Sequence, residues 1–273
     1  MVSEDEREFS TLKRYVHLKA GFDCDRYKEA PLKRRIRVRM RASGAKTWAE
    51  YLSLLKQDSS ELSSLFDVLT INVTKFFRNR ETYIALKEKV LRELVSEKRQ
   101  TESKGIRVWS AGCASGEEAY SVAILLRELL GSDYGGFTVE IWGTDLDRRS
   151  IEKAKAGVYS EASLEETDRA LREKYFTQDQ GYRISPEIAM VCQFFELDLL
   201  SGTNPLHALD LILCRNVLIY FARYFQERVF LDFASRLTGH GYLVLGRVET
   251  LVGEARNLFE TVDNKERIYR KQV

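Results

Sequence analysis

The feature that most constrains the fold is a loop of small residues between a predicted strand and a predicted helix. An apolar run over residues 106–111 leads into the loop Gly112–Gly116, and the acidic pair Glu117-Glu118 opens a helical pattern. A second apolar run ends at Asp145, 29 residues after Gly116. In a nucleotide-type α/β fold, glycines such as Gly112 let the backbone approach a ligand, and a carboxylate at the next strand tip accepts both hydroxyls of a ribose. The pattern therefore predicts a site for an adenosyl ligand.

The chemistry of this loop narrows the ligand further. The loop lacks Gly-x-Gly-x-x-Gly and carries no Lys-Ser/Thr pair, so it is not built to wrap a pyrophosphate or triphosphate. Two glutamates at a helix start repel phosphate but can hold a cationic amino group. The ligand that joins adenosine to a cationic amino-acid moiety is S-adenosylmethionine. The alternative explanation of the loop is a tight packing turn without a ligand.

Composition favours two domains with unequal charge. The 273 residues are 44% apolar, which is enough for a large core. Residues 1–80 hold 17 Lys/Arg against 11 Asp/Glu, whereas the remaining residues hold 26 against 30, so the basic end should meet an acidic partner. The spacing of four Cys and three His suggests neither a zinc cluster nor a disulfide framework. This cysteine usage fits a reducing cytoplasm, and no apolar run approaches the ~20 residues that span a bilayer, so we expect a soluble, cytoplasmic protein.

Hydrophobic periodicity changes along the chain. Residues 9–64 read as a small helical bundle, and residues 81–104 read as a charged connecting helix. From Ile106 onward, short apolar runs alternate with helical stretches, which predicts a parallel sheet covered by helices. The last two runs form an expected hairpin at the sheet edge. The predicted strands cover residues 106–111, 137–144, 193–197, 209–214, 242–245, 258–262 and 266–270.

A strongly basic helix is expected over residues 31–41. It begins with Pro31 in the first turn and carries six basic residues in nine. At 100° per residue, an apolar stripe of Leu32, Ile36 and Met40 lies opposite a set of arginines, Arg34, Arg37 and Arg41. A solvated cationic face is the alternative to a binding face. The absence of aromatic residues and the nearly neutral chain favour an acidic protein surface over nucleic acid.

Two strings carry a resemblance to a known family. They are Thr70-Ile71-Asn72-Val73-Thr74-Lys75-Phe76-Phe77-Arg78 and Cys214-Arg215-Asn216-Val217-Leu218-Ile219-Tyr220-Phe221. With these strings, the basic helix and the 109–121 segment in the family's order, the chain resembles the CheR family of chemotaxis receptor methyltransferases from about residue 10 to the end. The resemblance implies a class I S-adenosylmethionine-dependent methyltransferase (Rossmann-like) domain, an α/β fold, with a small N-terminal all-helical domain and a small β appendage. We expect a receptor-recognition domain over residues 1–80, a connecting helix over 81–104 and the methyltransferase domain over 105–273.

The same resemblance implies an enzyme, a protein-glutamate O-methyltransferase. It would transfer the methyl group of S-adenosylmethionine to glutamate carboxylates on the cytoplasmic helices of chemoreceptors, leaving S-adenosylhomocysteine and giving methyl esters for sensory adaptation. The implied partner is the cytoplasmic helical domain of these methyl-accepting receptors. We expect a monomer that uses no metal, binds no nucleic acid and does not insert into the membrane.

Site residues are carried over by position. Arg78 and Tyr220 are implied beside the transferring methyl group as the catalytic pair. Glu118 is implied to face the methionyl ammonium, Asp145 the ribose, and Asp198-Leu199 the adenine. The implied receptor-reading surface is Arg34, Arg37 and Arg41. The full implied cofactor set is Asn72, Thr74, Arg78, Gly112, Glu118, Asp145, Asp198, Leu199, Arg215 and Asn216. For Asp145 a helix-capping role, and for Tyr220 a place in the core, are the structural alternatives.

The chain departs from the family's usual pattern at two places. Gly246-Arg247-Val248-Glu249 replaces the frequent Gly-His-Ser-Glu, and Ala119 stands where Pro is usual. The segment 177–185 is expected to form the β appendage, and its shortness favours a member without a tether for a receptor's C-terminal peptide.

Two other functions stay open. A catalytically silent cofactor-binding scaffold is disfavoured because Arg78, Tyr220, Glu118 and Asp145 are all present. A nucleic-acid methyltransferase is disfavoured because Cys214 is followed by Arg-Asn and not by Pro.

Overall fold

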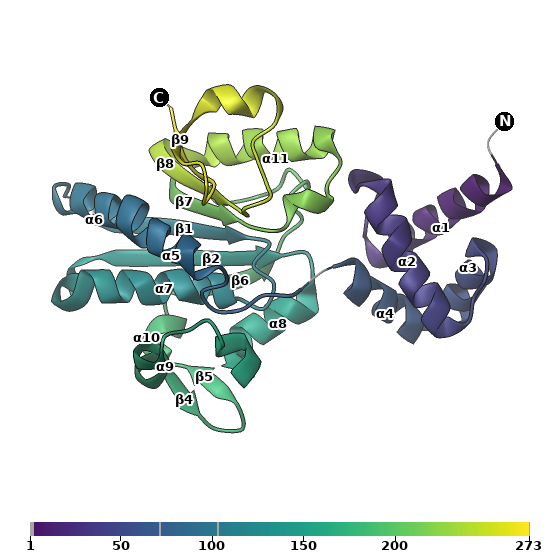
Figure 1. The fold of residues 1–273 in the computed structure, drawn as a ribbon, viewed down its shortest axis with the longest axis horizontal. Coiled ribbons are helices and arrows are strands. Elements are labelled where there is room, and N and C mark those ends of the chain that lie inside the picture. Colours follow the sequence, from purple (N-terminus) through teal and green to yellow (C-terminus); the bar gives the residue numbers. More distant parts are fainter. Residues whose placement is uncertain (1–2, 71, 103, 273) are drawn as a thin grey trace. The chain divides into compact units, whose positions relative to one another are not determined.

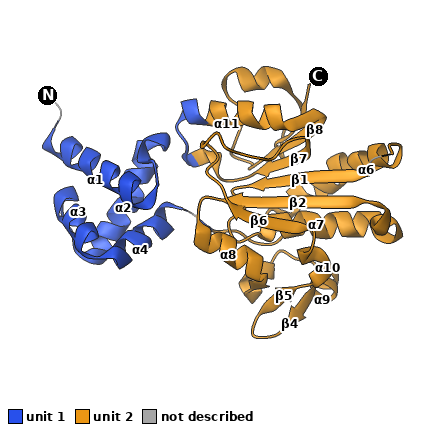
Figure 2. Cartoon of the chain, turned by 180° about the vertical axis from the view of Figure 1, so that it is seen from behind, with its two compact units in different colours: residues 1–72, 220–225 blue, residues 73–219, 226–273 orange. Residues whose placement is uncertain are grey.

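The chain divides into two compact units, shown in different colours in Figure 2. The computed structural model describes residues 3–70, 72–102 and 104–272, so Ile71 and Ser103 of the sequence predictions lie outside the described residues. The helical unit comprises residues 1–72 with 220–225, and the sheet unit comprises residues 73–219 with 226–273. The segment 220–225 therefore belongs to the helical unit although it lies far along the chain.

Helices with well-defined ends build the helical unit (Figure 1). Ser3 and Glu6 form a capping box at the first helix, and Gly21 ends that helix in the left-handed conformation with φ of 68°. The apolar stripe of the basic helix is buried, which confirms its predicted amphipathic pattern. The elements are α1 (Glu4–Ala20), the 3-10 turn η1 (Cys24–Arg26), α2 (Glu29–Ser43), α3 (Trp48–Gln57) and α4 (Ser59–Leu69).

A mixed sheet forms the centre of the sheet unit (Figure 1). Its strand order is β6-β2-β1-β7-β8-β10-β9. Neighbours from β6 to β8 are parallel, whereas β10 pairs antiparallel with both β8 and β9. The predicted parallel sheet and the C-terminal hairpin are both confirmed. The strands are β1 (Gly105–Ala111), β2 (Thr138–Asp145), β6 (Cys192–Glu196), β7 (Leu209–Cys214), β8 (Leu237–Leu245), β9 (Phe259–Asp263) and β10 (Ile268–Lys271).

Helices pack against this sheet and complete its core. Helix α6 contacts β1, α7 contacts β1, β2 and β6, and α8 contacts β2 and β6. The charged helix expected up to residue 104 is present but ends at Arg99, and it contains a π-helical turn. The elements are α5 (Arg80–Leu86), the π turn η2 (Lys87–Leu91), α6 (Arg92–Arg99), α7 (Glu117–Leu130), the 3-10 turn η3 (Gly131–Gly136), α8 (Arg148–Ala156), the 3-10 turn η5 (Leu218–Tyr220), α11 (Arg223–Arg236) and the 3-10 turn η6 (Gly253–Leu258).

The expected β appendage is a small antiparallel sheet of the order β3-β5-β4. This small sheet is part of the sheet unit, and aromatic rings pack it against the segment before α5: the Phe76 ring lies 4.8 Å from that of Tyr159 and 4.9 Å from that of Phe176, edge to face. Its elements are β3 (Val158–Tyr159), the 3-10 turn η4 (Glu161–Leu164), α9 (Arg169–Tyr175), β4 (Phe176–Gln178), β5 (Tyr182–Ile184) and α10 (Pro186–Ala189).

Strand β8 begins at Leu237, five positions before the predicted start at Tyr242. The intervening Thr-Gly-His-Gly residues are mostly polar, so they give no apolar signal from which a strand could be predicted. Gly241 allows the strand to continue against β7, because a Cβ at this position would lie 2.9 Å from the carbonyl oxygen of Leu209. The predicted strand was therefore too short.

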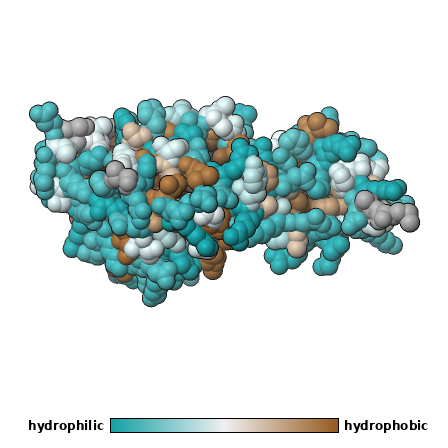
Figure 3. All heavy atoms as spheres, turned by 90° about the horizontal axis from the view of Figure 1, so that it is seen from above, coloured by the Kyte–Doolittle hydropathy of each residue, from teal (hydrophilic) through white to brown (hydrophobic). Residues whose placement is uncertain are grey.

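The surface seen in Figure 3 is mostly hydrophilic, with apolar side chains in small patches. Exposed large apolar residues include Val73, Met190 and Val248. Within the described ranges, no helix is both long and apolar enough to cross a membrane.

The close approach of β8 to β7 gives a prediction for stability. We expect Gly241→Ala to lower the free energy of unfolding by about 1–3 kcal/mol, because the added methyl group meets a strand backbone. Urea denaturation measures this change. Gly135→Ala is the matched control, since nothing lies within 4 Å of a Cβ at Gly135. Equal urea midpoints for the two variants would show that the β7–β8 contact is not tight.

Candidate functional site

The candidate site lies at the carboxyl ends of the parallel strands of the sheet unit. The register pairs Ala111 with Thr144 and Cys214 with Leu245, so neighbouring strands end level with one another. The loops that follow β1, β2, β6, β7 and β8 therefore leave the same edge of the sheet, which is where open α/β sheets bind ligands.

The loop after β1 follows the tip of β2 closely. The N–H groups of Gly112 and Cys113 both donate to the Thr144 carbonyl, at 2.8 and 2.9 Å. Gly112 has φ of 77°, and a Cβ there would lie 2.5 Å from Cγ2 of Val217. Gly116 has φ of 91°, so both glycines are required by backbone conformation and by packing. The loop of small residues is therefore also packed tightly against Val217, in the loop after β7.

Asp145 ends β2 with a carboxylate that is only partly used. Its Oδ2 accepts the N–H of Ala114 at 2.9 Å, and its Oδ1 accepts the N–H of Asp147 at 3.0 Å. Burial raises the pKa of Asp145, against the effect of these donors. The N-cap of α8 is Asp147, whose side chain accepts the N–H of Arg149, so Asp145 is not the helix cap. Since a carboxylate offers about four acceptor positions, Asp145 keeps capacity for ligand hydroxyls.

A buried ion pair joins α7 to the tip of β7. Glu118 accepts the Ser110 hydroxyl at 2.8 Å and faces the Arg215 guanidinium at 3.3 Å. The Nη2 of Arg215 also donates to the carbonyl of Arg78 at 2.8 Å and to the side chain of Asn79 at 3.1 Å. The Arg215 side chain is 3% exposed, and its Nε has no hydrogen-bond partner among the described residues. An N–H that is buried and unsatisfied beside a carboxylate fits the amino-acid part of a cofactor.

The other predicted cofactor residues lie on segments around this edge. Asp198 follows β6 and accepts the N–H of Leu200 at 2.9 Å, and Leu199 beside it is half-buried. Thr74 is half-buried in the sheet unit, whereas Asn72 is the last residue of the helical unit's first segment. Asn216 follows Arg215 and has φ of 63°.

Arg78 and Tyr220 belong to different compact units. In the sheet unit, Arg78 donates from Nη1 to the Val73 carbonyl at 2.7 Å. In the helical unit, the Tyr220 ring is half-buried, and the Arg35 guanidinium carbon lies 4.2 Å from its centroid. The Tyr220 carbonyl accepts the N–H of Lys28 at 2.8 Å. Tyr220 is therefore held by the helical unit without being a fully buried core residue.

The basic helix presents some arginines to solvent and uses others in packing. Arg34, Arg37 and Arg41 are exposed. Arg39 pairs with Glu61 of α4, and Arg35 donates to the Leu69 carbonyl at 2.8 Å. The inward role of Arg35 and Arg39 was not predicted, because charge alone does not show which cations find partners.

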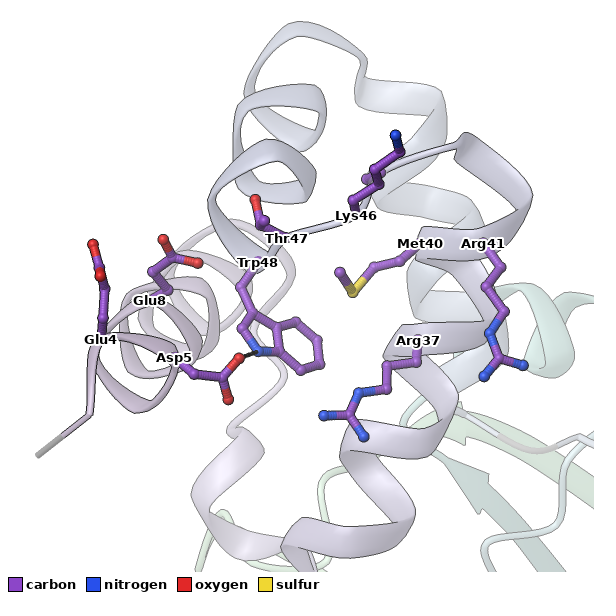
Figure 4. Close-up of a pocket in the computed structure, with 10 residues that line it drawn as sticks. Glu4, Asp5, Glu8, Arg37, Met40, Arg41, Lys46, Thr47 and Trp48 are labelled. Atoms are coloured by element: carbon purple, nitrogen blue, oxygen red, sulfur yellow. Dashed lines mark hydrogen bonds between the residues drawn. The ribbon is translucent and has the colours of Figure 1, made fainter.

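A groove of about 600 Å³ lies beside the exposed arginines of α2 (Figure 4). Arg37 and Arg41 of α2 line one side of the groove, with Arg37 extending toward Trp48, while acidic side chains from the first turns of α1 line the other side. Trp48 lies between the two sides, donating from Nε1 to Asp5 at 2.9 Å. The lining residues are Glu4, Asp5, Glu8, Arg37, Met40, Arg41, Ala45, Lys46, Thr47 and Trp48.

The cysteines are unsuited to nucleophilic chemistry. Cys113 and Cys214 are buried, and burial raises the pKa of both thiols well above the usual range. Cys214 is fully buried and packs in the core. The described residues hold no group of three His, Cys, Asp or Glu side chains that is suited to a metal ion.

Glu249 also lies at this edge of the sheet, and no role was predicted for it from sequence patterns. It is buried after β8, and its carboxylate accepts backbone N–H groups of the loop after β7. The signal was Gly246-x-x-Glu249, which was noted only as a departure at its two central positions. In the structure, Arg247 pairs with Glu266 and Glu81, each at 2.9 Å.

Comparison with known proteins agrees with the predicted resemblance. Residues 72–268 match the family described as CheR methyltransferase, SAM binding domain, and residues 7–70 match CheR methyltransferase, all-alpha domain. The chemotaxis protein methyltransferase of Listeria innocua is 32% identical over 265 residues, 97% of this chain and 98% of the relative. That of Borreliella burgdorferi is 31% identical over 251 residues, 90% of this chain and 89% of the relative. A TehB-like SAM-dependent methyltransferase structure from Corynebacterium glutamicum is 15% identical with a TM-score of 0.38, covering 71% of this chain and 95% of that one.

The buried acidic pair at the start of α7 gives a prediction on pH dependence. Burial raises the pKa of Glu117, so ionised Glu117 opposes folding at pH above this pKa, and the penalty vanishes when the carboxyl is protonated. We expect Glu117→Gln, which keeps an acceptor for Ser115, to raise the urea midpoint at pH 7. The gain should shrink as the pH falls toward 4. A Gln variant that is less stable than wild type at pH 7 would contradict this account.

Proposed function

Because the chain belongs to the CheR methyltransferase family, we propose that it methylates glutamate side chains on the cytoplasmic helices of chemoreceptors. The family match and the names of the relatives carry the coarser statement, S-adenosylmethionine-dependent methylation in chemotaxis. The methyl ester of glutamate is the proposed product. The proposal also assigns receptor recognition to residues 1–80, a connecting role to residues 81–104 and methyl transfer to residues 105–273.

The observation that carries the proposal is the set of charged groups at one edge of the sheet. Asp145 keeps acceptor positions for ribose hydroxyls at the tip of β2. Glu118 and Arg215 supply a carboxylate and a buried N–H donor, which suit an ammonium and a carboxylate on one ligand. A ligand in which an amino acid is joined to an adenosine would contact all of these groups. S-adenosylmethionine is such a molecule.

The proposed reaction does not require the protein to transfer a proton. When bound, S-adenosylmethionine supplies an activated methyl group on a sulfonium. A glutamate carboxylate, with an ordinary pKa of about 4.3, is already ionised at neutral pH, so no strong general base is needed. The work of the chain is to align the carboxylate and to exclude water around it. In this proposal the Arg78 guanidinium guides the carboxylate, and the Tyr220 hydroxyl donates a hydrogen bond near the methyl group.

Receptor recognition is proposed for the basic surface of the helical unit. Arg34, Arg37 and Arg41 are exposed on α2, and the last two line the groove of Figure 4. An acidic receptor helix fits this surface, because its methyl-accepting side chains are themselves carboxylates. The acidic side of the groove, formed by Glu4, Asp5 and Glu8 of α1, suits basic side chains on the same partner.

The alternatives from the sequence have less support. A methyltransferase that attacks a nucleic-acid base through cysteine needs a reactive thiol, whereas Cys214 is fully buried with a raised pKa. A catalytically silent scaffold would transfer no methyl group, so the assay described next distinguishes it from a methyltransferase.

The direct test is incubation with tritiated S-adenosylmethionine and a chemoreceptor cytoplasmic fragment. We expect labelled receptor that releases methanol in mild alkali, because carboxyl methyl esters hydrolyse there and N-methyl groups do not. Asp145→Ala, which removes the ribose acceptor, is the control. Label that is stable to alkali would refute the ester, and absence of label with intact cofactor binding would favour the scaffold.

The exposed arginines give a prediction on substrate recognition. We expect Arg37→Glu with Arg41→Glu to raise the Michaelis constant for a receptor fragment at least about tenfold, with unchanged S-adenosylhomocysteine affinity. Added salt should weaken wild-type recognition in the same direction. Lys19→Glu with Lys56→Glu is the control, since it makes the same charge change at exposed positions of α1 and α3. Equal Michaelis constants for the two double variants would remove the receptor-reading role.

A further inference from the structure

Glu249 is a buried carboxylate that the proposed chemistry does not use. It is 4% exposed and follows β8 in the turn that begins at Gly246. Its carboxylate accepts backbone N–H groups from two loops. Among the described residues these donors are Gly246 at 2.7 Å, Asn216 at 2.8 Å, Val217 at 3.0 Å and Ile219 at 3.2 Å.

Through these contacts, the Glu249 carboxylate links the loops that follow the neighbouring strands β7 and β8. The strand end of β7 at Cys214 pairs with that of β8 at Leu245, so the two loops start side by side. Three of the donors belong to the loop after β7, and each carboxylate oxygen accepts two of the four bonds. A buried charge is tolerated only when such donors surround it, and hydrogen bonds to an ionised acceptor are the strong ones. The carboxylate therefore fixes the path of the loop.

Steric fit at Gly246 supports the same conclusion. A Cβ at Gly246 would lie 2.6 Å from Oε2 of Glu249 and 2.8 Å from the backbone nitrogen of Asn216. The glycine is therefore what allows the carboxylate and the loop to meet. Between these two residues, Val248 is 73% exposed and Arg247 pairs with Glu266 and Glu81. Gly246 and Glu249 thus make the described contacts with the loop, while Arg247 and Val248 face other partners or solvent.

The held loop leads directly into Tyr220. Ile219 is the last residue of the sheet unit before the chain enters the helical unit. There the Tyr220 carbonyl accepts the Lys28 N–H at 2.8 Å, and Phe221 forms an antiparallel bridge with Tyr27. The backbone is thus anchored immediately before Tyr220 by Glu249 and immediately after it by the helical unit.

We propose that Glu249 is a positioning residue, which fixes the backbone from Asn216 to Ile219 and thereby sets the placement of Asn216 and Tyr220. Its consequence for turnover rests on the proposed function, whereas its effect on the loop does not. Glu249→Gln tests both. The amide keeps one acceptor oxygen but places an NH₂ group against N–H donors, so bonds to the loop are lost.

The first measurement is hydrogen–deuterium exchange of the apo protein, which needs no substrate. In Glu249→Gln we expect amides of residues 216–219 to exchange at least tenfold faster than in wild type. The matched control is Asp210→Asn, at the other end of β7. Asp210 is also 4% exposed, and it accepts the Arg107 N–H at 2.9 Å and pairs with Lys98 at 2.8 Å. Unchanged exchange at residues 216–219 in Glu249→Gln would overturn the proposal.

The second measurement separates positioning from a loss of stability. We expect the kcat of Glu249→Gln for receptor methylation to fall at least tenfold, whereas Asp210→Asn keeps wild-type kcat even where its stability falls. In a Tyr220→Phe background the same substitution should cost much less, because both changes act on one group. Glu249→Asp, which keeps the charge, should retain more turnover than the amide. If the fold-reductions in kcat of the two single variants multiply in the double variant, Glu249 does not act through Tyr220.

If Glu249→Gln does not fold, Glu249→Asp carries both measurements, because the shorter carboxylate keeps its charge and loses reach. Faster exchange at residues 216–219 with reduced kcat is then the expected pair of results. Wild-type exchange rates in Glu249→Asp together with wild-type kcat would overturn the proposal. A wild-type protein that shows the protected loop but methylates no receptor would instead refute the proposed function alone.

Discussion

The ion pair between Glu118 and Arg215 is the interaction on which the candidate site most depends. Removing one partner from a buried pair leaves an unpaired charge and is costly, so the two side chains hold each other in place. Arg215 extends this effect, because it also binds the carbonyl of Arg78 and the side chain of Asn79. A single guanidinium thus connects the tip of β7, the start of α7 and the segment that carries Arg78.

The carboxylates around this pair differ in how much of their capacity the protein uses. Glu249 accepts N–H groups on both oxygens from two loops and is committed to holding backbone. Asp145 accepts one N–H on each oxygen and keeps positions for a ligand. Burial raises the pKa of both carboxylates, so a raised pKa alone does not separate Glu249, which holds backbone, from Asp145, for which ligand binding is proposed. Their hydrogen-bond partners make this distinction.

Much of the fold was predictable because its elements have strong local signals. The apolar runs of the parallel strands and the stripe of α2 follow the periods of buried strands and amphipathic helices. The early start of β8 was not predictable, since Thr-Gly-His-Gly carries no apolar alternation. The inward turn of Arg35 depends on partners far along the chain, Leu69 and Tyr220, which sequence spacing does not reveal. For the candidate site, Glu118 was predicted from the acidic pair at a helix start and Asp145 from its place at a strand tip, whereas the role proposed for Glu249 rests on its hydrogen bonds.

The central claim is that Glu118 and Asp145 bind different parts of one adenosyl ligand. Calorimetric titration with S-adenosylhomocysteine and with methylthioadenosine, which lacks the amino-acid part, tests it most directly. Glu118→Gln should weaken S-adenosylhomocysteine binding about tenfold or more beyond any loss of methylthioadenosine binding, because only the first ligand loses the charge-assisted bond to its amino group. Asp145→Ala should weaken both ligands, because both contain the ribose. Equal losses for the two ligands in Glu118→Gln, or no loss in either variant, would contradict the account.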